Sequence, residues 1–224
     1  MNTNERGSIE QLILADLRPV RRLARPWQRA LAVSGLAALV AWVVYRQFGV
    51  RPDAKTLGDA VLWGLSALQV LYGVLLIVSA LREAVPGRML EHRMAAVLLL
   101  VGLGVVLTVT SVTWNTHVSH VPIGKEALYW GHCFSTPILI GLPSLLVTIV
   151  LAFRAYPTRP ALTGTLAGLG AGLLSDASWR TYCEITDPFH VLSSHVAAIV
   201  VLTVSGMVAG LVISRASTKT GQEW

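Results

Sequence analysis

Two cysteines and six histidines are the side chains of this sequence best suited to metal or redox chemistry. Both cysteines, Cys133 and Cys183, fall at one predicted end of the apolar segments, together with five histidines: His117, His120, His132, His190 and His195. Thiolate and imidazole are ligands that suit zinc and copper. Neither C-x-x-C nor H-E-x-x-H occurs, so the spacing predicts a candidate metal site without identifying a cofactor.

The two cysteines leave three interpretations open. They could form a structural disulfide, serve as a redox- or metal-responsive dithiol, or be two unrelated buried thiols. A position outside the bacterial cytoplasm exposes thiols to oxidising conditions, which favours the first two interpretations. A disulfide requires Cα atoms roughly 4.4–6.8 Å apart, a distance that the sequence does not give.

The elements that must position these residues are membrane helices. Of the 224 residues 54% are apolar and only 13% charged, with a mean hydropathy of +0.61, whereas soluble domains are about 25% charged. Six apolar runs reach the roughly 20 residues needed to cross a bilayer: residues 27–48, 57–81, 94–116, 127–153, 161–179 and 189–214. The sequence therefore predicts an all-α, polytopic six-transmembrane-helix bundle.

The basic residues predict how this bundle is oriented. Thirteen of the 18 lysines and arginines fall on one side of the predicted spans, and this side is the cytoplasmic one by the positive-inside rule. Both termini are then in the cytoplasm of a bacterium, with the protein in its inner membrane and both cysteines on the outer face. Contact with the lipid bilayer explains the pI of 9.8 without a nucleic-acid partner.

Three segments follow from this topology. They are a cytoplasmic tail over residues 1–26, a membrane domain over residues 27–214 and a second cytoplasmic tail over residues 215–224.

Charge inside the membrane domain is rare. We expect Asp59 and Asp176, both near predicted helix ends, to be solvated at the interface, which leaves no carboxylate at mid-depth for the proton relay of a transporter.

Small residues predict one helix contact. Gly164, Gly168 and Gly172 recur every four residues in the fifth span, and Gly206 and Gly210 do so in the sixth. Such stripes let two backbones approach closely. We therefore expect the fifth and sixth spans to pack together.

The N-terminal tail has the pattern of a short amphipathic helix. Ser8 and Gln11 have the spacing of a capping box, and Pro19 ends the pattern. One apolar stripe results, formed by Ile9, Leu12, Ile13 and Leu17. A helix of about ten residues is marginal alone in water. It therefore needs a surface, either the membrane or the groove of a partner protein.

Three stretches of the chain resemble a known family. They are Leu14 to Leu23 with the sequence LADLRPVRRL, the cysteine opening the fourth span with PTRPALTG after that span, and the second cysteine between spans five and six. In these the chain resembles the six-span membrane anti-sigma factors typified by the negative regulator of sigma-F, the NrsF family. It is also similar to the light-responsive anti-sigma factor of carotenoid regulation.

The resemblance implies a protein without enzymatic activity that holds an extracytoplasmic-function sigma factor at the membrane until an outside stress releases it. Cys133 and Cys183 match the family's paired sensing cysteines. The tail matches its sigma-binding segment, with the candidate contacts Ile9, Leu12, Ile13, Asp16, Leu17, Val20, Arg21 and Arg22. The signal could be oxidant, metal or light-derived. The alternative function is a metal- or haem-dependent membrane oxidoreductase using the outer histidines. The sequence leaves the oligomeric state open.

Overall fold

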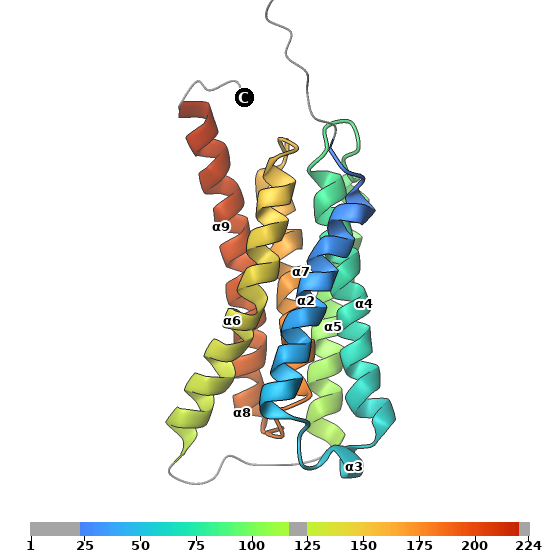
Figure 1. Ribbon diagram of the computed structural model, residues 1–224, viewed down its shortest axis with the longest axis vertical. Helices are drawn as coiled ribbons and strands as arrows, with labels where there is room; N and C mark the ends of the chain where they lie inside the picture. Colours follow the sequence, from blue (N-terminus) through green and yellow to red (C-terminus); the bar gives the residue numbers. More distant parts are fainter. Residues whose placement is uncertain (1–22, 117–124, 220–224) are drawn as a thin grey trace, which may run out of the picture.

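The computed structural model describes residues 23–116 and 125–219, which are helical throughout apart from short connections (Figure 1). Six long helices run side by side: α2 (Pro26–Phe48), α4 (Asp59–Glu83), α5 (His92–Thr116), α6 (Glu126–Phe153), α7 (Pro160–Arg180) and α9 (Ala197–Lys219). Shorter elements are α3 (Ala54–Leu57), α8 (Pro188–His190) and a π-helical turn, η1 (Val191–Val196), which leads into α9. The predicted all-α class is confirmed.

Five of the helical segments are long and apolar enough to cross a membrane. They are Pro26–Phe48, Asp59–Glu83, His92–Asn115, Leu128–Phe153 and Pro188–Ala216, and the chain is therefore a membrane protein. The predicted fifth span, α7, is the exception, because glycine, serine and threonine replace apolar residues along it. The structure thus supports five of the six predicted spans by composition, and the count of six stays a prediction.

Helix α7 occupies the centre of the bundle, where it packs against α9, α4, α6 and α2. Fifteen of its 21 residues are buried. A helix enclosed by other helices meets little lipid, so it does not need an apolar surface all round. This position explains why α7 differs in composition from its neighbours.

The contact predicted between the fifth and sixth spans is confirmed. A Cβ atom added to Gly164 would lie 2.1 Å from the Gly206 carbonyl oxygen, and one added to Gly168 would lie 2.3 Å from that of Leu202. The α7 and α9 backbones are therefore too close for any side chain at these positions. Helix α9 also continues to Lys219, five residues past the predicted end of the last span.

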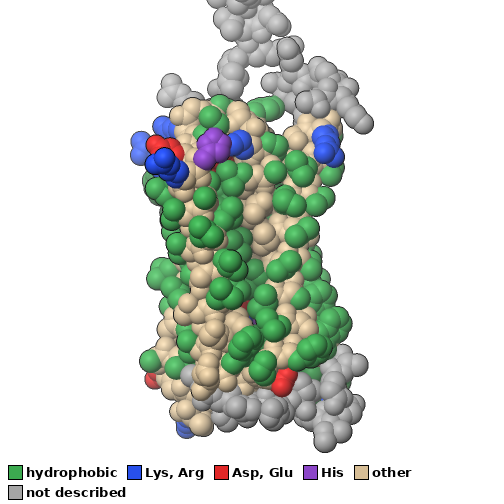
Figure 2. All heavy atoms as spheres, turned by 180° about the vertical axis from the view of Figure 1, so that it is seen from behind, with side chains coloured by type: hydrophobic (Ala, Val, Ile, Leu, Met, Phe, Trp, Pro, Cys, Tyr) green, Lys and Arg blue, Asp and Glu red, His purple; other side chains and the backbone are tan. Residues whose placement is uncertain are grey.

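Basic residues gather at one end of the bundle, which we call the arginine-rich end (Figure 2). There the buried Glu83 carboxylate accepts hydrogen bonds from Arg159 Nε, at 2.6 Å, and from the Leu90 amide, at 2.7 Å. Arg29 donates to the carbonyl oxygens of Leu81 and Leu151 in the last turns of α4 and α6. These contacts fix the start of α2 and the α4–α5 connection.

Candidate functional site

The two cysteines meet at the end of the bundle opposite the arginine-rich end. Cys133 lies two turns into α6, and Cys183 lies in the connection that follows α7. Their Sγ atoms are 3.7 Å apart and form a thiol hydrogen bond, and the side chains are 3% and 6% exposed. Because the thiols are neighbours, the interpretation as two unrelated cysteines loses support.

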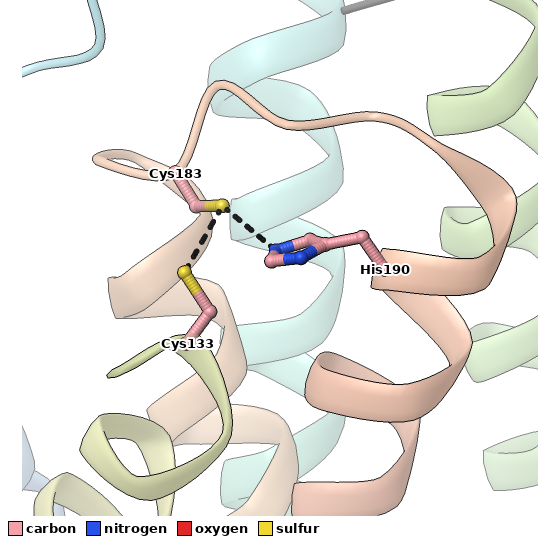
Figure 3. A group of neighbouring side chains, drawn as sticks. All are labelled: Cys133, Cys183 and His190. Atoms are coloured by element: carbon pink, nitrogen blue, oxygen red, sulfur yellow. Dashed lines mark hydrogen bonds between the residues drawn. The ribbon is translucent and has the colours of Figure 1, made fainter. Parts of the chain in front are cut away.

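His190 completes this group (Figure 3). Its Nε2 atom lies 3.6 Å from Cys183 Sγ. Asp187 caps the turn that carries His190, because its Oδ1 atom accepts hydrogen bonds from the amides of Phe189 and His190 at the start of α8. The donor atoms of Cys133, Cys183 and His190 all lie within 4.8 Å of one another. Two sulfurs and one imidazole nitrogen form a donor set that suits a soft cation such as zinc or copper.

A buried ionic cluster lies beside the cysteines. Asp176 is 0% exposed, and its carboxylate accepts hydrogen bonds from His195 Nδ1 at 2.7 Å, Arg180 Nε at 2.7 Å and Gln69 Nε2 at 2.6 Å. Arg180 also donates to Thr113 Oγ1, at 3.1 Å. The cluster therefore links α4, α5, α7 and the π-helical turn.

This cluster corrects one expectation from the sequence. Asp59 is exposed as predicted, but the prediction of a solvated Asp176 is wrong. The end of α7 is covered by neighbouring helices, so its carboxylate has ion-pair and hydrogen-bond partners in place of water. The signal that could have revealed it is the i, i+4 spacing of Asp176 and Arg180, which places opposite charges on one helix face.

Two cavities are lined in part by Cys183. The wider one, of about 160 Å³, is lined by both cysteines together with Tyr129, His132 and Glu184. A narrower one, of about 20 Å³, has Cys183, His195, Arg51 and Arg180 among its lining residues. The wider cavity is large enough to admit a small reagent to both sulfurs.

The Cys183 thiol does not ionise readily at neutral pH. Its hydrogen bond with Cys133 and its burial both raise the pKa of Cys183 above its ordinary value. The reduced pair therefore keeps a proton on Cys183, in agreement with a hydrogen bond for which one of the two sulfurs must be protonated.

Comparison with known proteins identifies the family. The family model described as NrsF, negative regulator of sigma F, matches residues 14–215. The chain belongs to the NrsF family. No curated protein and no solved structure matches it. As an NrsF protein it is a negative regulator of a sigma factor, and the family gives no support to the alternative of a membrane oxidoreductase.

In this NrsF protein the predicted histidines have different partners, although the rings of His190 and His195 meet with centroids 5.8 Å apart. His190 joins the two sulfurs, and His195 faces the ionic cluster through Asp176. His132 is exposed at one side and its ring packs edge-on against the Trp179 ring, with ring centroids 5.2 Å apart. His117 and His120 lie outside the described residues, as do all the predicted sigma-binding contacts: Ile9, Leu12, Ile13, Asp16, Leu17, Val20, Arg21 and Arg22.

Sequence reasoning missed the aromatic residues that enclose the thiols. Trp179 is fully buried in one apolar cluster with Cys133, Cys183, Val44 and Ile185. It lies four residues before Cys183 in α7. No local motif marks it, because its importance comes from the packing of α2, α6 and α7 around it.

Proposed function

We propose that this protein is an inner-membrane anti-sigma factor that binds an extracytoplasmic-function sigma factor through residues 1–26 and releases it after a signal at Cys133 and Cys183. The observation that carries this proposal is the pair of buried thiols, 3.7 Å apart, at the end of the bundle opposite the arginine-rich end. Membership of the NrsF family supplies the output, negative control of a sigma factor.

The proposed orientation of the protein in the membrane follows from the distribution of charge. The exposed arginines Arg82, Arg88, Arg93 and Arg154 lie at the end where α2 begins. The positive-inside rule makes this end cytoplasmic, so both termini are in the cytoplasm. The cysteine pair then faces outward, about 30 Å of hydrocarbon away from the tail.

Oxidation is the first signal that the geometry suits. A hydroperoxide would take two electrons from the thiols, and the products would be one disulfide, one alcohol and one water. The sulfurs would have to close from 3.7 Å to the bond length of about 2.05 Å. Buried thiols that already touch need only a small local movement to do so.

A soft cation is the second signal, because Cys133, Cys183 and His190 converge. Zinc bound about 2.3 Å from each sulfur would leave the two sulfurs near their present separation of 3.7 Å, and it would release the thiol protons. The two signals differ in their need for His190, since disulfide formation uses sulfur alone. In the proposal either signal alters the packing around Cys183, and sigma is released as a consequence.

The decisive experiment uses full-length protein in nanodiscs with its cognate sigma factor bound. We expect hydrogen peroxide to release sigma from the wild type and not from the Cys133→Ser/Cys183→Ser variant. The chain has only two cysteines, so loss of thiol labelling reports on this pair alone. Deleting residues 1–26 should abolish sigma binding in the reduced protein.

Two results would overturn the proposal. One is full sigma binding by the variant that lacks residues 1–26. The other is undiminished sigma binding by wild-type protein after both peroxide and zinc have been shown to reach the pair. The variant His190→Asn separates the signals, because it should weaken the response to zinc and leave the response to peroxide intact.

A further inference from the structure

The last turn of α2 lies directly on the cysteine cluster. Val44 is buried with Cys133 and Cys183 in one apolar cluster. The Phe48 ring meets Trp179 edge-on with centroids 5.3 Å apart and lies 5.1 Å from the Tyr182 ring. Any rearrangement of the thiols therefore changes the surface on which α2 rests.

Arg51, three residues beyond α2, holds the connection that carries Cys183. Its backbone amide donates to the Thr181 carbonyl at 2.9 Å, and its Nη2 atom donates to the Glu184 carbonyl at 3.1 Å. The guanidinium is in turn held by the Asp53 carboxylate. These two hydrogen bonds bracket Cys183 in the chain, so the connection and the end of α2 should move together.

At its other end α2 has a second attachment. Arg29 is buried and donates to the carbonyl oxygens of Leu151, at 2.9 Å, and Leu81, at 3.1 Å. Carbonyl groups in the last turn of a helix have no partner within that helix, so a guanidinium is well suited to bind them. This attachment lies immediately after the N-terminal segment of the chain.

Between these attachments α2 is lightly packed, except at Val33, which is fully buried. The helix is the least buried of the five candidate spans. A groove of about 440 Å³ runs beside its outer half, between α2, α4 and α7, with Trp42, Tyr45 and Trp63 along it. The outer half of α2 therefore has room beside it, whereas the segment around Arg29 and Val33 is packed into the core.

We infer that α2 transmits the state of the cysteine pair to the N-terminal segment, with Phe48 and Arg51 as the coupling contacts. This inference rests on the proposed function and adds the route by which the signal crosses the membrane. Closing the sulfurs shifts the Cys183 connection, Arg51 and Phe48 carry the shift to α2, and α2 tilts about its attachment at Arg29. The tail that continues from α2 then meets sigma in a changed position.

The test measures two quantities in the same nanodisc sample. Thiol labelling gives the extent of the Cys133–Cys183 disulfide, and co-purification gives the affinity for sigma. We expect oxidation to weaken wild-type binding by about 5-fold or more, the lower limit of typical coupling between sites. In Phe48→Ala and Arg51→Gln the disulfide should form as in the wild type, while sigma affinity changes less than about 2-fold.

The matched control is Trp42→Ala, because Trp42 is a 59% exposed aromatic residue on the same helix. It should keep the wild-type response. The two coupling variants act independently, and tryptophan fluorescence shows whether each is folded. If both folded variants, Phe48→Ala and Arg51→Gln, release sigma on oxidation as the wild type does, the inference about α2 is overturned and the proposed function is not. Retention of sigma by a fully oxidised wild type would instead overturn the proposed response of sigma binding to oxidation, and the inference with it.

Discussion

Replacing Asp176 by asparagine is the sharpest test of the buried ionic cluster. The substitution keeps the shape of the side chain and removes its charge. Arg180, whose side chain is 10% exposed, then loses its ion-pair partner inside the protein. Two further donors, on His195 and Gln69, would meet an amide that can accept at only one of its two terminal atoms.

The expected cost follows from these contacts. Breaking a buried ion pair by removing one partner costs about 3–5 kcal/mol, because the remaining charge is left uncompensated. We therefore expect Asp176→Asn to lower the free energy of unfolding by about 3 kcal/mol or more. Removing both charges in Asp176→Asn/Arg180→Met should cost less than the sum of the single changes, with a coupling of about 0.5–3 kcal/mol.

Denaturant unfolding of the purified protein in detergent micelles, followed by tryptophan fluorescence, measures these differences. The matched control is Asp59→Asn, because Asp59 is an exposed aspartate at the start of a helix, and its substitution should change stability by less than about 0.5 kcal/mol. Equal stability of the Asp176→Asn and Asp59→Asn variants would refute the reasoning. Strict additivity in the double variant would show that Asp176 and Arg180 do not interact.

Two further predictions concern packing and pH. Gly168→Ala should cost about 1–3 kcal/mol in unfolding measurements, because its Cβ would lie 2.3 Å from the Leu202 carbonyl, whereas Gly104→Ala, which meets open space, should be neutral or stabilising. Equal stability of the Gly168→Ala and Gly104→Ala variants would contradict this prediction about packing. In the reduced wild type, the hydrogen bond with Cys133 and burial raise the pKa of Cys183, so its thiolate fraction stays low at neutral pH. Mass spectrometry of the peptide that carries Cys183 follows its alkylation separately from that of Cys133. The alkylation rate by iodoacetamide should rise with pH to a midpoint above about 8.5, and a midpoint below this value would count against a buried, protonated thiol.

Much of the fold could be predicted from the sequence because membrane helices follow simple local rules. The predicted spans end within a few residues of the observed helices, since length and apolarity decide where a helix can cross a bilayer. The contact between Gly164 and Gly206 was also predictable, because only small residues allow such close backbones. The location of Cys133 and Cys183 at the same end of the bundle was predictable as well, because the predicted order of the spans puts both cysteines on one side of the membrane.

The composition of the site could not be predicted, because it depends on how the helices pack. Burial of Asp176 follows from the central position of α7, and the one local pattern that points to it is the i, i+4 spacing of Asp176 and Arg180. Gln69 and His195 reach this carboxylate from two other elements, far away in the sequence. In the sequence, the feature that sets His190 apart from the other described histidines is the aspartate three residues before it, Asp187, which caps the turn that carries His190.

The last turn of α7 joins the two clusters of the site. Asp176 and Arg180 attach this turn to α4, α5 and the π-helical turn, while Trp179 packs against α2 and α6. Cys183 follows three residues later. Because the ionic cluster holds α7 in place, movement at Cys183 is more easily passed to the lightly packed α2 than to the core. In the proposed response the last turn of α7 is therefore the fixed part, and the connection after it, which carries Cys183, is the part that moves.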